Sequence, residues 1–247
     1  MVNYKISVIS YLNSIPFVYG LNSSTIFKSL NLQLDYPSVC ADKLIDNVVD
    51  IGLVPVVVLK DYPSFKIISE YCIGANGDVD TVCLFSNVTI QDVQEIYLDY
   101  QSRTSVELLK ILCREYWKIN PLFKQSKVGF ENNINKNTAA LIIGDRAFHA
   151  NHKYEFVYDL SKYWTKMTGL PFVFACWISN KEISKDFLLE FNNSLKRGIS
   201  NIHESVKKEY ENIILLNNAE DYLNNKISYI LDEKKRKGMN LFISKIK

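Results

Sequence analysis

The sequence predicts an α/β protein built as two lobes. Short apolar runs rich in β-branched and aromatic residues alternate with amphipathic stretches along all 247 residues, which is typical of α/β folds with mixed, mostly parallel sheets. Hydrophobic residues make up 47% of the chain and aromatic residues 13%, enough for one large core or two smaller ones. Because no stretch rich in Gly and Ser interrupts the pattern, we expect ordered strands to join the two lobes.

The first lobe is expected to begin with alternating strands and helices. Its strands are predicted in five apolar segments: KISVIS (5–10), LQLDY (32–36), DIGLVP (50–55), FKIISEYCIGA (65–75) and DTVCLFS (80–86). One helix is predicted from Pro16 to about Leu30, and a second begins at Ser38, a favoured N-cap residue. This part of lobe 1 would end near residue 88.

The second lobe is expected to contain the strand EIYLDY (95–100), the helix SRTSVELLKILCREYW (102–117) and the buried strand AALIIGD (139–145). The strand PFVFACWIS (171–179) would return the chain to the first lobe, where one long amphipathic helix is predicted from Ser184 onward. Residues 1–88 and 176–247 are therefore assigned to lobe 1, and residues 89–175 to an inserted lobe 2.

The charge pattern argues against a nucleic-acid or membrane partner. There are 29 Lys and Arg residues against 27 Asp and Glu residues, and neither sign dominates a long block. The longest apolar run, GLVPVVVL, is too short to cross a bilayer, and the start MVNYKISVIS lacks the pattern of a signal peptide. We therefore expect a cytoplasmic protein that binds a small molecule.

The cysteines and histidines do not predict a metal site or a disulfide framework. The five cysteines are widely spaced in apolar contexts and are expected to be buried small hydrophobes: Cys40, Cys72, Cys83, Cys113 and Cys176. The three histidines lack the spacing of metal ligands and are expected at the surface: His149, His152 and His203.

Polar turns follow several predicted strands. The stretch SVISYLNSIPF places Ser10, Tyr11 and Asn13 between a strand and the helix that follows. In YLDYQSRTSVELL, a strand leads into a helix whose first turn offers four polar side chains: Ser102, Arg103, Thr104 and Ser105. A helix N-terminus with hydroxyls and an arginine can bind a carboxylate or phosphate.

A structural reading of the same helix start remains open. Thr104 and Glu107 have the spacing of a capping box, so Ser102 or Thr104 could simply cap the helix while Arg103 is solvated. Ligands of open α/β sheets bind beyond the carboxyl ends of strands. In our assignment that position is taken by four segments, which would face one central cleft: Ser10 to Ser14, Val54 to Pro55, Ser102 to Ser105, and Gly144 to Asp145.

Six segments together resemble the successive motifs of the chorismate dehydratases, the first enzymes of the futalosine route to menaquinone. They are SYLNSIPF, DIGLVPVVVL, TVCLFS, LDYQSRTSVELLKIL, ALIIGDRAF and YDLSKYWTKMTGLPFVFACW. They run in order from Ser10 to Trp177, roughly two thirds of the chain. That family is similar in fold to the type II periplasmic binding proteins, with two α/β lobes joined by two crossovers.

The resemblance implies an elimination of water from chorismate that needs no cofactor and no metal. It implies that Asn13 is essential and that a hydroxyl on the TVCLFS strand contacts substrate. Thr81 stands where relatives often have serine, so Ser86 is kept as an alternative. The helix start at Ser102 to Ser105 would hold a substrate carboxylate.

The base is left open by the sequence. Asp145 follows a strand within a matched motif, but its neighbour Arg146 suggests a structural ion pair. The family instead suggests that the enolpyruvyl carboxylate of the substrate takes the C3 proton. Tyr11 and Pro55 are expected in the pocket, whereas the aromatic run Phe172, Phe174 and Trp177 is more typical of a core.

Two other functions compete with this interpretation. Dihydroxynaphthoate synthase of the same route shares the fold and is expected to use a pocket histidine, whereas LIIGDRAF has none before His149. A non-catalytic binder or sensor of a small acid could use the same scaffold. The sequence does not distinguish a monomer from a homodimer.

Overall fold

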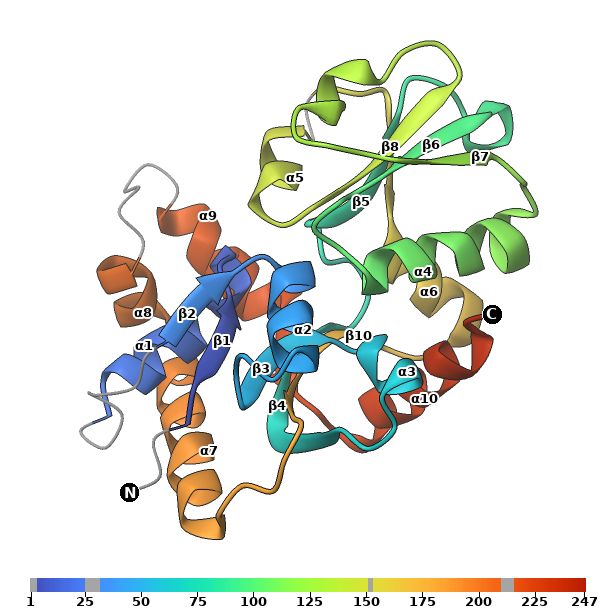
Figure 1. Ribbon diagram of the computed structural model, residues 1–247. Helices are drawn as coiled ribbons and strands as arrows, with labels where there is room; N and C mark the ends of the chain where they lie inside the picture. Colours follow the sequence, from blue (N-terminus) through green and yellow to red (C-terminus); the bar gives the residue numbers. More distant parts are fainter. Residues whose placement is uncertain (1–3, 25–31, 151–152, 210–215) are drawn as a thin grey trace. The chain divides into compact units, whose positions relative to one another are not determined.

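The computed structural model describes residues 4–24, 32–150, 153–209 and 216–247, and the chain divides into two compact units (Figure 1). Unit 1 consists of Met1–Gly74 and Val173–Glu233, and unit 2 of Ala75–Phe172 and Lys234–Lys247. Each unit has its own sheet and its own helices. The structure is α/β, as the sequence predicts.

Unit 1 is built on a six-stranded sheet in the order β11-β4-β10-β3-β1-β2. Its strands are β1 (Ile6–Ile9), β2 (Leu32–Asp35), β3 (Ile51–Pro55), β4 (Lys66–Ala75), β10 (Phe172–Ser179) and β11 (Ser228–Ile230). Strand β1 runs parallel to β2 and β3, whereas β10 runs antiparallel to β3, and β11 antiparallel to β4. The parallel strands β1 and β3 therefore end at the same edge of the sheet.

The helices of unit 1 include a short 3-10 turn that leads directly into a helix. They are η1 (Leu12–Ser14), α1 (Ile15–Asn22), α2 (Pro37–Ile45), α3 (Val58–Asp61), α7 (Lys185–Ile199), α8 (Ile202–Glu209), α9 (Leu216–Asp221) and the π-helix η6 (Tyr222–Lys226). Helices α1 and α7 approach closely through Gly20 and Gly198, where an added Cβ would meet backbone atoms of the other helix. Such contact requires residues without side chains.

Three helix predictions need correction or restriction. Helix α1 spans Ile15–Asn22, and the predicted continuation over residues 25–31 lies outside the described residues. Helix α2 begins at Pro37 with Tyr36 in the N-cap position, so Ser38 is not the cap; proline is favoured at the first helical position because its missing N–H has no partner there anyway. The single helix predicted after Ser184 is two helices, α7 and α8, separated at residues 200–201.

Unit 2 is built on a five-stranded sheet in the order β7-β6-β8-β5-β9. Its strands are β5 (Val82–Ser86), β6 (Glu95–Leu98), β7 (Leu122–Gln125), β8 (Thr138–Ile143) and β9 (Phe156–Asp159). Strand β6 runs parallel to β7 and β8, and β5 runs antiparallel to β8 and β9. In each sheet one strand, β1 or β6, has a parallel neighbour on both sides, and the next strand beyond one of these neighbours is antiparallel. The expected mostly parallel pairing therefore holds for part of each sheet.

The helices of unit 2 come from both stretches of its chain and include the C-terminal helix. They are η2 (Ile90–Asp92), α4 (Thr104–Leu112), the π-helix η3 (Cys113–Trp117), η4 (Phe130–Asn133), α5 (Asp145–Ala150), α6 (Leu160–Thr168) and α10 (Glu233–Lys245). Helix α10 joins unit 2 through polar contacts, since Arg114 Nη2 donates to the Lys245 carbonyl at 2.9 Å and Lys245 pairs with Glu115.

The division of the chain therefore differs from the boundaries at 88 and 176 that the sequence suggested. Strand β5 belongs to unit 2 because it pairs on both sides with strands of that unit. The C-terminal residues 234–247 also fall in unit 2. The physical reason is that sheet pairing assigns a strand to a unit, and pairing partners are distant in sequence.

Burial in the core agrees with two predictions. All five cysteines are buried thiols outside any disulfide bond, which confirms their prediction as small core hydrophobes. Phe172 and Trp177 are fully buried, Phe174 is nearly so, and Trp177 contacts the rings of Phe17 and Phe191. Within the described part of the chain, no helix is both long enough and apolar enough to span a bilayer.

Candidate active site

The unit 1 candidates lie where β1 and β3 end. Ser10 is exposed directly after β1, Tyr11 is largely buried, and Asn13 is half-buried in η1. Pro55 is the last residue of β3. In the pairing of β1 with β3, Ile6 lies opposite Ile51 and Ser7 opposite Gly52. Extending this register by three residues places Ser10 opposite Pro55. The structure therefore brings these four residues to one edge of the sheet of unit 1.

Asn13 is held by two hydroxyl groups. The Ser14 hydroxyl donates to Asn13 Oδ1 at 3.1 Å, and the Tyr229 hydroxyl donates to the Asn13 carbonyl at 3.0 Å. The Tyr229 ring packs edge-on against Phe17 of α1, with centroids 5.3 Å apart, and burial raises the pKa of Tyr229 well above its ordinary value. Tyr229 therefore stays a neutral hydrogen-bond donor that fixes the backbone of the turn.

The unit 2 candidates gather at one edge of the second sheet, where β6 and β8 end and β5 begins. The Gly144 N–H donates to the Thr81 carbonyl at 2.9 Å, and the Ile143 N–H donates to Asp99 Oδ2 at 2.9 Å. Gly144 has φ +65°, a left-handed conformation that favours glycine. Thr81, Gly144, Asp145 and the turn that opens α4 are therefore neighbours.

The side chain that accepts a hydrogen bond from the first turn of α4 belongs to neither Thr104 nor Glu107, the pair with capping-box spacing. The Ser105 N–H donates to Ser102 Oγ at 3.1 Å, so Ser102 supplies the acceptor. Glu107, the expected partner of Thr104, instead pairs with Lys110 at 2.7 Å. Ser102 and Arg103 are half-buried and Thr104 and Ser105 are buried, so the turn presents a mixture of polar groups at the positive end of the helix dipole.

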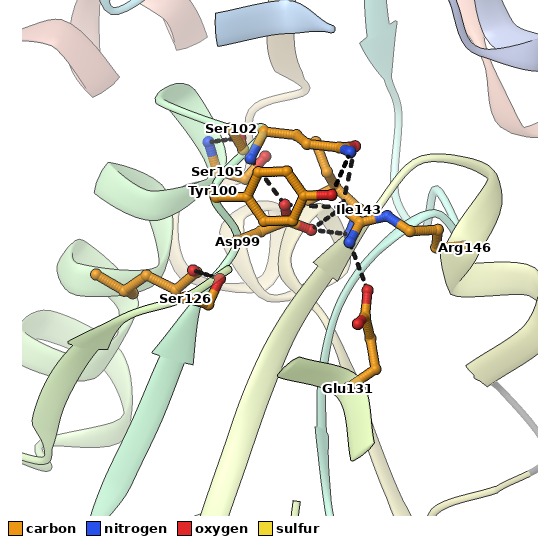
Figure 2. Close-up of polar contacts among 10 residues, drawn as sticks. Asp99, Tyr100, Ser102, Ser105, Ser126, Glu131, Ile143 and Arg146 are labelled. Carbon is orange, nitrogen blue, oxygen red and sulfur yellow. Dashed lines mark hydrogen bonds and ion pairs between the residues drawn. The ribbon is translucent and has the colours of Figure 1, made fainter. Parts of the chain in front are cut away.

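The buried carboxylate of Asp99 forms hydrogen bonds with the backbone on both sides of this sheet edge (Figure 2). Asp99 follows β6, and its side chain has no exposed surface. Its oxygens accept from the backbone N–H of Gln101 and of Ile143, each at 2.9 Å, and from Arg146 Nη2 at 2.6 and 2.8 Å. Its carbonyl accepts from the Ser102 N–H at 3.2 Å. One residue therefore joins the end of β6, the end of β8, α5 and the approach to α4.

The electrostatics of Asp99 suit a structural role. Burial raises the pKa of Asp99, while the Arg146 guanidinium and the two backbone N–H groups oppose that rise. Every one of these contacts comes from a donor, so the ionised carboxylate is the form that satisfies them. Asp99 is therefore poorly placed to accept a substrate proton.

The structure adds to what the sequence suggested about two polar residues. Arg146 forms ion pairs with Asp99 and with Glu131, two carboxylates that the sequence did not pair with it. Ser86 lies at the other end of β5, paired with Ala139 and Phe156, and its hydroxyl accepts from the Val88 N–H at 3.1 Å. With about 3.3 Å per residue, the five residues from Thr81 to Ser86 place the two side chains ~17 Å apart along the strand.

A polar cavity of about 240 Å³ also lies in unit 2, beside the segment that contains Thr81. Its lining includes Asp78, Asp80, Asp159, Lys162 and Tyr163. Asp159 Oδ2 accepts from the N–H groups of Val79 and Asp80, both at 2.7 Å, and thereby fixes the chain just before Thr81. Among the residues that the structure describes, no group of three or more His, Cys, Asp or Glu side chains is placed to hold a metal ion.

The sequence did not single out Asp99, Gln101 or Tyr229, and it indicated Arg146 only as an ion-pair partner of Asp145. One local signal was present, since Asp99 directly follows a buried strand that leads into a polar helix start. The contacts of Arg146 and Tyr229 carry no such signal, because each joins segments far apart in the chain.

Comparison with solved structures defines the class of fold. A protein of Archaeoglobus fulgidus aligns over 98% of this chain and 96% of its own, with a TM-score of 0.78 and 12% identity. A Candida albicans protein with the generic periplasmic binding protein fold aligns over 98% of this chain and 90% of its own, with a TM-score of 0.63 and 11% identity. The protein therefore has a periplasmic-binding-protein-like fold.

Sequence comparison then identifies the family. A family model described as menaquinone biosynthesis matches residues 4–247, so the chain belongs to that family. It is also similar to the chorismate dehydratase of Thermus thermophilus, with 28% identity over 207 residues that cover 74% of each chain.

Proposed function

We propose that the protein is a chorismate dehydratase, a hydro-lyase that converts chorismate to 3-[(1-carboxyvinyl)oxy]benzoate and water. The observation that carries the proposal is the similarity to the Thermus thermophilus enzyme over three quarters of the chain, within a family that spans residues 4–247. The polar groups at the sheet edges of both units support it, because the substrate is a small dianion rich in oxygen.

The proposed reaction is an elimination that balances without an added reagent. The C3–H bond and the C4–O bond of the ring break, the electron pair from C3 completes an aromatic ring, and the proton and hydroxide leave as water. The protein must hold two carboxylates, direct a base to C3 and assist the departing hydroxyl. The gain of aromaticity favours the product.

We assign the roles from the sequence motifs, and the geometry within each unit supports them. The positive end of α4, with Ser102, Arg103 and Ser105, would hold one substrate carboxylate. Asn13 would orient the substrate through its side-chain amide, while Tyr229 fixes the backbone of Asn13. Thr81, at the same sheet edge as the start of α4, would supply the hydroxyl, and the position of Ser86 at the far end of β5 favours Thr81 over it.

The base in this proposal is the enolpyruvyl carboxylate of the substrate itself. Asp99 does not compete for this role, because its oxygens are engaged by backbone N–H groups and by Arg146. Asp145 is the alternative base that the sequence offers. Catalysis would then come mainly from orientation, because a base within the same molecule reacts with a high effective concentration once its conformation is fixed.

The test is an incubation of the purified protein with chorismate alone. We expect one aromatic product, lighter than chorismate by one water, detected by chromatography and mass spectrometry. An incubation without protein controls for spontaneous breakdown of chorismate. Unchanged chorismate with folded protein would contradict the proposal and leave the related naphthoate-forming reaction or a binding role to be examined.

A matched pair of variants tests the site. Asn13→Ala should abolish turnover with an unchanged circular dichroism spectrum, whereas Asn193→Ala, on the exposed face of α7, should keep wild-type turnover. Wild-type activity of Asn13→Ala would remove Asn13 from the site.

A further inference from the structure

Arg146 forms several polar contacts near the candidate carboxylate site, although it is not one of the residues to which the proposed reaction assigns a role. It lies in the short helix α5, and its side chain is 28% exposed. Figure 2 shows it reaching across the ends of the strands toward Asp99 and Glu131. The question is what this guanidinium does for the neighbouring start of α4.

The guanidinium makes contacts that only a planar fork with several donors can make together. Nη2 donates to both oxygens of Asp99 and, at 3.0 Å, to Gln101 Oε1, while Nη1 donates to Glu131 of η4. The guanidinium carbon also lies 5.3 Å from the ring centre of Tyr100 and 5.8 Å from that of Phe130. Such stacking limits its rotation as well as its position.

The contacts continue from Arg146 into the helix start. The guanidinium binds the side chains of Asp99 and Gln101, which lie three residues and one residue before Ser102. The Asp99 carbonyl accepts from the Ser102 N–H, and Ser102 Oγ in turn accepts from the Ser105 N–H. A displacement of the guanidinium would therefore be transmitted through consecutive hydrogen bonds to the residues of the carboxylate site.

We propose that Arg146 is a positioning residue that sets the geometry of the Ser102–Ser105 turn and thereby the affinity for a substrate carboxylate. The role of that turn rests on the proposed function. Arg146 acts through Asp99 and Gln101 and does not itself touch the substrate. Lysine cannot replace it, because an ammonium is a compact charge that can pair with Asp99 but cannot also engage Gln101 and Glu131 in the same plane.

Steady-state kinetics with chorismate test the proposal through Arg146→Lys and a control, Glu131→Gln. We expect Arg146→Lys to raise KM about tenfold with kcat changed less than threefold, because a weakened carboxylate contact is lost equally from ground and transition states. Glu131→Gln removes the charge of the outer ion pair but leaves the contacts to Asp99 and Gln101, so both constants should stay within about twofold. Wild-type KM in a folded Arg146→Lys enzyme, or equal effects of the two variants, would overturn the proposal.

Hydrogen exchange separates this proposal from the proposed function. In Arg146→Lys, amides of residues 101–105 should exchange at least tenfold faster than in the wild type, while those of α6 stay unchanged. If wild-type protein does not dehydrate chorismate, the proposed function fails, and wild-type exchange of residues 101–105 in the variant would separately refute the positioning role. Should Arg146→Lys not fold, Gln101→Met, which keeps the Arg146–Asp99 pair, should show the same exchange effect at about threefold.

Discussion

The crossing of α1 and α7 offers a prediction that follows directly from the backbone. A Cβ added at Gly198 would lie 1.7 Å from the Pro16 carbonyl oxygen and 3.1 Å from the Gly20 nitrogen. Ordinary contacts of a Cβ begin at 3.4 Å, so Gly198→Ala requires the two helices to separate by about 1.7 Å, the difference between 3.4 and 1.7 Å. The obstructing atoms are backbone atoms and cannot rotate away.

The expected change in the free energy of unfolding of Gly198→Ala combines two opposing effects. Overpacking of this kind costs typically 1–3 kcal/mol, and rigid backbone on both sides puts this case at about 3 kcal/mol. Alanine has the higher helix propensity, which returns about 1 kcal/mol. We therefore expect Gly198→Ala to lower the free energy of unfolding by roughly 2 kcal/mol, because the clash outweighs the propensity.

The perturbation should also reach the candidate site, since Pro16 lies three residues after Asn13. Urea denaturation followed by circular dichroism gives the loss of stability, and chorismate turnover gives the effect on the site. Asn193→Ala, on the exposed side of α7, is the matched control and should be neutral or slightly stabilising. A Gly198→Ala protein as stable as the wild type would refute the reasoning about this helix crossing.

Three further predictions concern single groups. Arg103→Glu should raise KM for chorismate at least tenfold, because it replaces a charge-assisted hydrogen bond worth about 1.5–3 kcal/mol by repulsion, and an unchanged KM would exclude Arg103 from the site. Tyr229→Phe should lower stability by about 1 kcal/mol and reduce kcat by loosening Asn13, whereas full kcat would show that other contacts suffice. Burial raises the pKa of Cys40 and of Cys113 to about 12, so at pH 9 roughly one thiol in a thousand is ionised. Iodoacetamide should therefore label these cysteines only after unfolding, and rapid labelling of native protein would contradict their burial.

The local elements could be predicted from the sequence because their signals are local. Strands such as β3 and β8 are continuous apolar runs, and the helix α4 shows apolar residues at helical spacing. Element ends were less well predicted: the Ser38 cap and the unbroken helix after Ser184 were wrong, because Pro37 starts α2 and the chain turns at residues 200–201. The grouping of Gly144 and the start of α4 at one sheet edge agrees with the strand-end argument within unit 2. Thr81 was suggested by the family resemblance alone, and it lies at this edge because β5 runs antiparallel to β8 and begins there.

The sequence by itself determined the fold class, the burial of the cysteines and the family motifs, since periodicity and motif spacing are written within short stretches of chain. Only the tertiary structure decided which strands pair, so that β5 lies between β8 and β9 and the chain divides after residue 74. Only the tertiary structure brings Arg146 into an ion pair with Asp99, 47 residues away, and the Tyr229 hydroxyl to the Asn13 carbonyl, 216 residues away. These partners are selected by burial and hydrogen-bond satisfaction in three dimensions, and neither leaves a periodic pattern in the sequence.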